Sequence, residues 1–267
     1  AEEMAYPAEE LDAMWKLVLL NQFHDTLPGS AIHEVYEVTK KEYAQLAEQL
    51  TEMSGERRRA IAGGGEAVTI FNPIGRERAD VVNLGSFEGN AITDGEGNVY
   101  PVQKTKEGSI AFVKGLPSKG YQSFEAFDTQ ETDKPFCLHG DRELETPFYS
   151  VKFDEGGMFT GLYDKDNDRE VIQPGQRANL LRMYEDKPIY FDNWDIDIYY
   201  TEKFWDVDQA ERMEWTEMGP VRAVLEIDRK ASNSSFTQKI IFYAKSRRID
   251  FVTHVDWKEH QTLLKVH

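Results

Sequence analysis

The sequence predicts a mainly β protein that begins with a pair of α-helices. Apolar residues recur at every third or fourth position over about the first sixty residues, which is the spacing of an amphipathic helix. After Gly63-Gly64-Gly65 the spacing changes to two, the period of a strand, and glycine-containing turn signals recur at short intervals. The β part is therefore expected to contain many short strands, as antiparallel β-sandwiches do.

Two helices are predicted before the three glycines. The first follows Pro7, a residue suited to the first turn of a helix, and places Leu11 and Trp15 on one apolar stripe. Leu27-Pro28-Gly29 interrupts the pattern, and Ser30 is placed to cap the second helix. The stripe of the second helix consists of Ile32, Val35, Tyr36, Thr39, Tyr43, Leu46, Leu50 and Met53. Such stripes pack together in an antiparallel hairpin, predicted here over residues 1–62.

Two β-sandwich domains are predicted after the helices, a small one over residues 66–130 and a large one over 137–267. In the large domain, Val221–Asp228 alternates between apolar and polar residues, and Lys245–Arg248 joins two strands as a hairpin. The sequence stops at Val266-His267 without a closing turn, so we expect the last sheet to be truncated there. Four tryptophans are expected in the core rather than at a sugar site: Trp15, Trp205, Trp215 and Trp257.

Composition and charge narrow the classes of partner. The 267 residues carry a net charge of −17, and a surface this acidic repels phosphate backbones and anionic lipids. The longest apolar run, Leu17–Leu20, is much too short for a membrane span, and the first residues show no signal-peptide pattern. Neither nucleic acid nor membrane is therefore expected as a partner, whereas a neutral sugar is compatible with the charge.

Cysteine usage indicates a reducing compartment. Cys137 is the single cysteine, so no internal disulfide can form. This is consistent with a cytoplasmic location. Between Phe136 and Leu138, the thiol is expected to be a buried apolar filler rather than a nucleophile.

One segment carries candidate chemistry at the end of the first helix. Gln22, His24 and Asp25 form a polar cluster just before Pro28-Gly29, and groups at a rigid helix end keep fixed directions. An imidazole is a good zinc ligand, and a carboxylate can accept hydrogen bonds from sugar hydroxyls. One histidine is at most a quarter of a tetrahedral zinc shell, however, and the same pair could simply be a local helix cap.

This segment resembles a motif of glycoside hydrolase family 38, the α-mannosidases. Asn21-Gln22-Phe23-His24-Asp25-Thr26-Leu27-Pro28-Gly29-Ser30 is similar to a segment at the end of that family's helical middle domain, in the cytosolic and bacterial branch. Three further matches follow in family order. They are Val68–Pro73, Tyr184–Pro188 with Asp192–Ile196, and Asp250–His260.

The resemblance implies a zinc-dependent retaining enzyme whose β-domains are of the galactose-mutarotase-like supersandwich type, here incomplete. It implies that His24 is a zinc ligand and that Asp25 contacts substrate hydroxyls beside the metal. The family's other zinc ligands, its nucleophile and its general acid belong to an amino-terminal α/β domain that precedes these segments. No catalytic residue is therefore assigned to this chain, and zinc is expected to bind it weakly or not at all.

Two other groups of residues were weighed as sites. Tyr190, Asp192 and Trp194 form an aromatic and acidic cluster that could bind a sugar, or could be a packed loop between strands. The run 192–197 could bind calcium, but it lacks the glycine and glutamate of an EF-hand loop. The His-x-Asp triplets 139–141 and 254–256 are interpreted as a turn and as one outward strand face.

The sequence thus favours the carboxyl-terminal portion of an α-mannosidase that hydrolyses terminal α-D-mannosyl residues of oligosaccharides. The expected partners are a mannose-containing oligosaccharide and the missing amino-terminal α/β catalytic domain, and a homo-oligomer is left open. The isolated chain is expected to be inactive. The alternatives are a non-catalytic β-sandwich carbohydrate-binding or scaffold module, and a protein that binds metal through this chain's own histidines.

Overall fold

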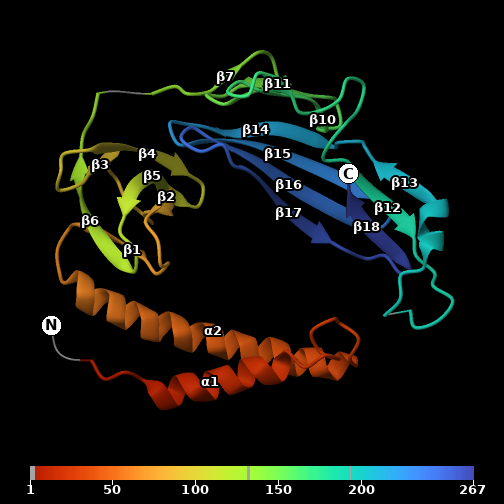
Figure 1. Ribbon diagram of the computed structural model, residues 1–267, viewed down its shortest axis with the longest axis horizontal. Coiled ribbons are helices and arrows are strands. Elements are labelled where there is room, and N and C mark those ends of the chain that lie inside the picture. The colour runs from red at the N-terminus through yellow and green to blue at the C-terminus, as the bar shows by residue number, and fades with distance from the viewer. Residues whose placement is uncertain (1–3, 131–132, 193) are drawn as a thin grey trace. The chain divides into compact units, whose positions relative to one another are not determined.

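The structure, a computed structural model, describes residues 4–130, 133–192 and 194–267 (Figure 1). Two α-helices are followed by antiparallel sheets, which confirms the predicted mainly β fold class. The chain divides into two compact units. One comprises Ala1–Gly65 and Pro188–Ile196, and the other comprises Glu66–Lys187 and Asp197–His267.

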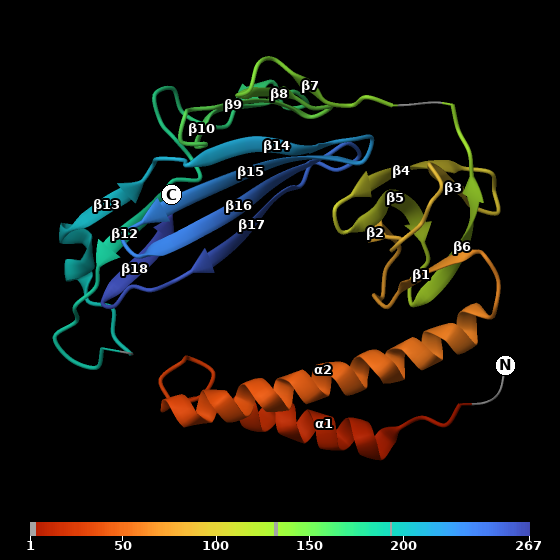
Figure 2. The ribbon, with the colours of Figure 1, turned by 180° about the vertical axis from the view of Figure 1, so that it is seen from behind.

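The helical unit is an antiparallel pair formed by α1 (Ala8–Asn21) and α2 (His33–Ala62), seen from behind in Figure 2. The end of α1 contacts the first half of α2, since Thr39 Oγ1 donates to Asn21 Oδ1 at 2.7 Å. The second helix ends at Ala62 and is capped by Gly63, whose φ of 72° suits glycine and whose N–H donates to the Arg59 carbonyl. In the part of the chain that the structure describes, no helix is long and apolar enough to cross a membrane.

The predicted cap of the second helix is wrong. The helix begins at His33, so Ile32 occupies the N-cap position and provides no side-chain cap. Ser30 lies two residues too early, and its hydroxyl donates to the Asp25 carbonyl at 3.3 Å instead. The serine therefore forms a hydrogen bond within the connection between the helices and does not cap the second helix.

A six-stranded antiparallel sheet follows the helices, with strand order β1-β6-β3-β4-β5-β2. Its strands are β1 (Val68–Asn72), β2 (Arg78–Asn83), β3 (Ala91–Thr93), β4 (Val99–Thr105), β5 (Gly108–Leu116) and β6 (Gly120–Phe127). Ile92, Ala111, Val113 and Phe124 form the centre of its core and are fully buried. This sheet accounts for the alternating pattern that begins after the three glycines.

The rest of the second unit contains three more sheets. The five-stranded sheet comprises β7 (Cys137–Leu138), β8 (Glu143–Glu145), β9 (Tyr149–Phe153), β10 (Phe159–Asp164) and β11 (Arg169–Glu170). The four-stranded sheet comprises β14 (Arg212–Met218), β15 (Arg222–Ala231), β16 (Ser234–Tyr243) and β17 (Ile249–Asp256). The three-stranded sheet comprises β12 (Leu181–Glu185), β13 (Phe204–Val207) and β18 (Thr262–Val266), with the short helix η1 (Ile198–Glu202) before β13.

The five-stranded and four-stranded sheets pack face to face as a sandwich. One buried cluster joins Val151 and Phe159 of the first sheet to Leu225, Ile240 and Phe242 of the second. Strands β16 and β17 pair in register from Phe242↔Ile249 onward, which confirms the predicted hairpin. The apolar residues that alternate along β15 and β16 therefore lie on the face of the sheet that the other sheet covers.

Within the same unit, the six-stranded sheet is bonded to the four-stranded sheet. The side-chain carbonyl of Gln103 accepts hydrogen bonds from the backbone N–H groups of Val221 and Arg222 at 3.0 and 2.9 Å. Gly219 permits this approach, because a Cβ there would lie 2.3 Å from the Gln103 side chain. The domain limits 66–130 and 137–267 stay predictions.

Two expectations about burial are wrong. Cys137 is exposed, because strand alternation turns its neighbour Phe136 inward. Trp15, Trp205 and Trp257 are also exposed, by 63%, 38% and 37%. Trp215 is half-buried and packs against the core of the sandwich.

Candidate functional site

The segment that carries His24 and Asp25 forms the connection between α1 and α2. It is a run of turns, in which the N–H groups of Thr26 and Leu27 donate to the Phe23 carbonyl at 2.9 and 3.0 Å. Tyr36 of α2 holds it from the other side: its hydroxyl accepts from the Ala31 N–H and donates to the Thr26 carbonyl. The connection is thus tied to the second helix by side-chain bonds, as the predicted rigid helix end requires.

Asn21 fixes the end of the first helix in this connection. Its side-chain amide donates to the Leu17 carbonyl at 3.1 Å and to Glu42 Oε2 at 2.7 Å, and its oxygen accepts from Thr39. Asn21 is buried, with 8% of its surface exposed. Asn21 is part of the motif in the sequence, but no role was predicted for it. Its position could have indicated a role, because this polar residue lies one helical turn after the apolar residues Leu17 and Val18.

His24 and Asp25 lie side by side with their side chains open to solvent. The imidazole is 72% exposed and the carboxylate 53%, and His24 Nε2 lies 3.6 Å from Asp25 Oδ2. The ring of Phe23 lies against the imidazole, with a centroid distance of 4.2 Å. Neither side chain is buried in a hydrogen-bond network of the protein, so both can contact a ligand.

The pair fits part of a metal site but not a whole one. Among residues 4–130, 133–192 and 194–267, no group of three or more His, Cys, Asp or Glu side chains could hold a metal ion. Structural and catalytic zinc sites take at least three protein ligands. His24 and Asp25 can therefore contribute to a zinc site only if further ligands come from elsewhere.

The predicted sugar-binding residues lie in a segment that groups with the helical unit, Pro188–Ile196. Tyr190 and Trp194 are 72% and 58% exposed, and Asp192 is also exposed. A turn shapes the segment, since the N–H groups of Trp194 and Asp195 donate to the Phe191 carbonyl at 2.7 and 2.9 Å. Exposed aromatic faces suit sugar stacking, whereas the alternative of a packed loop would bury them. Asn193, within the calcium alternative, lies outside the described residues.

The two other His-x-Asp triplets have the predicted local structure. His139 and Asp141 belong to the turn between β7 and β8, where Gly140 has a φ of 72°. His254 and Asp256 are exposed on the same face of β17. Neither pair is part of a group that could hold a metal in the described residues.

Apolar side chains stand exposed on and around the connection that bears His24. Leu19, Leu20 and Phe23 near the end of α1 are 60%, 67% and 53% exposed, and Leu27 and Ile32 are about as exposed, at 70% and 69%. Exposed apolar surface of this extent marks an interaction site more often than a free surface. The helical unit therefore presents a candidate interface beside its candidate ligands.

Comparison with known proteins shows the class to which this fold and segment are related, the α-mannosidases. Residues 1–61 match the family model described as "Alpha mannosidase middle domain", and residues 144–267 match "Glycosyl hydrolases family 38 C-terminal domain". The chain belongs to glycosyl hydrolase family 38, of which it holds the end of the middle domain and the carboxyl-terminal domain.

Individual relatives agree with this assignment. The chain is 28% identical over 276 residues to Alpha-mannosidase 2C1 of Homo sapiens and 26% identical over 306 residues to Alpha-mannosidase G of Dictyostelium discoideum. These matches cover 99% and 97% of this chain but 25% and 28% of the relatives. The chain thus spans about a quarter of the length of the curated relatives it matches.

A solved structure shares the fold. The crystal structure of an alpha-mannosidase from Enterococcus faecalis V583 superposes with a TM-score of 0.73 at 14% sequence identity. The match covers 98% of this chain and 39% of that one. The chain therefore shares the fold of the corresponding part of that protein.

Proposed function

We propose that this chain is the carboxyl-terminal portion of a zinc-dependent retaining α-mannosidase that hydrolyses terminal α-D-mannosyl residues of oligosaccharides. The observation that carries the proposal is the exposed, adjacent pair His24 and Asp25 at a fixed helix connection in a family 38 chain. A buried and fully bonded pair would have had no face for an ion or a sugar to reach.

Each member of the pair has a distinct role in the proposal. The His24 imidazole is one zinc ligand, and the Asp25 carboxylate accepts hydrogen bonds from substrate hydroxyls next to it. A bound zinc ion supplies a fixed positive charge that orients sugar oxygens and stabilises developing negative charge on them. Asn21 acts as a positioning residue, because its bonds to Thr39 and Glu42 fix the helix end from which His24 projects.

The nucleophile and the general acid are proposed to lie in a catalytic domain that this chain lacks. A retaining glycosidase needs two carboxyl groups about 5–5.5 Å apart across the scissile bond. Two observations support a missing domain: the chain spans about a quarter of its relatives, and the helical unit leaves Leu19, Leu20 and Phe23 exposed. We propose that the catalytic domain covers these side chains and brings the remaining zinc ligands to His24.

The segment 188–196 is proposed to contact the oligosaccharide beyond the cleaved residue. Tyr190 and Trp194 offer exposed aromatic faces, and Asp192 offers a hydrogen-bond acceptor. Its grouping with the helical residues in one compact unit supports a role close to the His24 connection. The free thiol of Cys137 and the absence of any second cysteine in the sequence support a cytoplasmic location.

The test compares two exposed histidines in the polypeptide that carries this chain together with its catalytic domain. We expect His24→Ala to lower kcat/KM for a nitrophenyl α-mannoside by about a hundredfold and to reduce bound zinc. His33→Ala is the matched control, because His33 is exposed at the start of α2 outside the motif, and it should stay within about twofold.

Two results would contradict the proposal. One is turnover of the nitrophenyl mannoside by the 267-residue chain alone, which would mean that the catalytic groups lie within it. The other is a His24→Ala enzyme with full zinc content and full activity. Saturable oligosaccharide binding by the isolated chain, lost in Trp194→Ala and without hydrolysis in any larger form, would favour the carbohydrate-binding module.

A further inference from the structure

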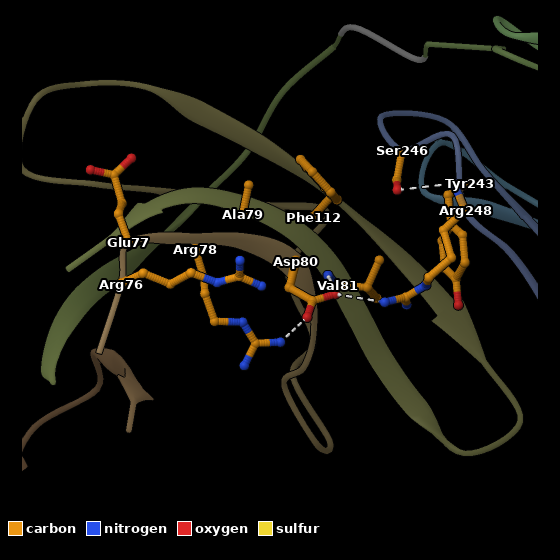
Figure 3. Close-up of a pocket in the computed structure, with 10 residues that line it drawn as sticks. All are labelled: Arg76, Glu77, Arg78, Ala79, Asp80, Val81, Phe112, Tyr243, Ser246 and Arg248. Carbon is orange, nitrogen blue, oxygen red and sulfur yellow. Dashed lines mark hydrogen bonds and ion pairs between the residues drawn. The ribbon is translucent and has the colours of Figure 1, made fainter. Parts of the chain in front are cut away.

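A pocket of about 330 Å³ in the second unit is lined by arginine side chains, although the protein as a whole is strongly acidic (Figure 3). It lies where β2 meets the connection between β16 and β17. Arg78 is the first residue of β2, Arg76 lies two residues before it, and Arg248 comes from the connection. A cavity of this size is in the range of small-molecule sites, about 300–1,000 Å³.

Two of the three guanidinium groups are held in place by the protein. Asp80 pairs with Arg78 on one side and, at 3.7 Å, with Arg248 on the other. Arg248 also donates to Asp250 at 3.0 Å and stacks on the ring of Tyr243, 4.8 Å from its centroid. Because planar guanidinium groups fixed in this way lose little further freedom on binding, they are preorganised for an oxyanion.

Arg76 differs from the other two arginines. It is exposed, and the described part of the chain places no carboxylate within salt-bridge distance of it. Figure 3 shows its guanidinium extending toward that of Arg78, while Glu77 between them points away. Asp80 and Asp250 balance the charges of Arg78 and Arg248, so the charge of Arg76 is the uncompensated positive charge in the pocket.

The alternative interpretation is that Arg76 is an ordinary solvated surface residue. Three features favour a ligand: the concave site, the fixed pair beside it, and the local reversal of charge in a protein of net charge −17. Guanidinium groups bind phosphate and carboxylate oxygens with two parallel hydrogen bonds, and both Arg76 and Arg78 line the pocket.

We propose that this pocket binds the phosphate group of a small phosphate monoester, for which glucose 6-phosphate serves as the probe. Arg76 and Arg78 bind the phosphate oxygens, and Arg248 borders the site from the opposite side of Asp80. The volume left beside the phosphate holds the organic part of the ligand. The site lies wholly in the β unit, so the proposal does not depend on the roles assigned to His24 and Asp25.

The test is calorimetric titration of the whole chain with glucose 6-phosphate and with glucose, at constant ionic strength. We expect saturable binding of glucose 6-phosphate and none of glucose. Arg76→Gln should weaken binding about tenfold or more, since it removes charge-assisted hydrogen bonds. Arg169→Gln, which changes another exposed arginine, on β11 and without a carboxylate partner in the described residues, should change affinity by less than about twofold.

A second variant tests the sign of the charge effect. Asp80→Asn removes the carboxylate that Arg78 and Arg248 share, so glucose 6-phosphate should bind more tightly. Circular dichroism of each variant verifies that it is folded. Any of three results would overturn the proposal: no saturable binding by the parent chain, equal weakening in Arg76→Gln and Arg169→Gln, or weaker binding by folded Asp80→Asn.

Discussion

The helical unit and the β unit bury their apolar side chains to very different degrees. Among the described residues up to Gly65, Leu46 is the one buried hydrophobic residue. In the β unit, by contrast, Leu225, Ile227 and Ile240 of the four-stranded sheet are each 0% exposed. The helices carry amphipathic patterns as clear as those of the strands, yet one pair of helices offers too little surface to cover both apolar stripes.

This difference shows where the two units obtain their stability. Most helices in proteins are stabilised by the packing of an apolar face rather than by helix propensity. Two sheets packed face to face satisfy that requirement internally, as the shared cluster around Phe159 and Phe242 demonstrates. The helical unit does not, and it is also the unit that carries His24 and Asp25. The residues proposed to act on substrate thus lie in the part of the chain that most needs a covering domain.

The largest expected effect is the loss of a core aromatic from the β unit. Phe242 is 1% exposed and contacts the rings of Phe153 and Phe159, so Phe242→Ala should lower the free energy of unfolding by about 3–5 kcal/mol. Leu20→Ala on the helices should change it by no more than about 0.5 kcal/mol. Urea denaturation of both variants measures their free energies of unfolding. Equal decreases in the two variants would contradict the prediction.

A smaller loss is expected from Asn21→Ala in the helical unit. The substitution leaves the Thr39 hydroxyl and the Glu42 carboxylate without their partner, which should cost about 1–3 kcal/mol. Thermal unfolding followed by circular dichroism at a helix-sensitive wavelength checks it. Gln22→Ala, at the exposed next position, is the control. If both variants melt alike, Asn21 does not fix the helix end.

The sequence predicted the parts of the fold that depend on local pattern. The helix pair and the hairpin of β16 and β17 follow from periodicity and turn residues, and both are present. The predicted cap of the second helix was wrong because the Ser30 hydroxyl bonds back to the Asp25 carbonyl, and the helix begins three residues later at His33. Burial of Trp15 was also wrong, because periodicity reveals an apolar stripe but not whether another element covers it.

The candidate sites show the same limit. His24 and Asp25 are neighbours in the chain, so the sequence already placed them together. Arg76 and Arg248 are 172 residues apart (248 minus 76), and only the packing of two sheets brings them to one pocket. Asn21 was quoted within a motif, but its role depends on Glu42 of the other helix. Contacts that cross between elements cannot be read from spacing in a single sequence.

Acid should destabilise the β unit through specific ion pairs. Hydrogen bonds from Arg247 and Asn167 lower the pKa of Asp164 from 3.8 to about 2. A lowered pKa in the folded state contributes stability above pH 3.8, and this contribution is lost as the pH falls from 3.8 through 2. Asp164→Asn should therefore flatten the dependence of the melting temperature on pH in this window. Asp141→Asn, in an exposed turn, should leave that dependence unchanged.

The smallest expected effect on stability belongs to the residue with the largest proposed role in activity. The His24 side chain is 72% exposed, so His24→Ala should change the free energy of unfolding of this chain by less than about 0.5 kcal/mol. The isolated chain should also keep less than stoichiometric zinc after dialysis, measured by mass spectrometry, since one imidazole lacks the further ligands that make a zinc site tight. A decrease in the free energy of unfolding above that limit would mean that His24 supports the fold. Retention of one zinc ion would mean that the chain forms a complete zinc site by itself. The helical unit would then not need ligands from a covering domain, and the proposed difference between the two units would be wrong.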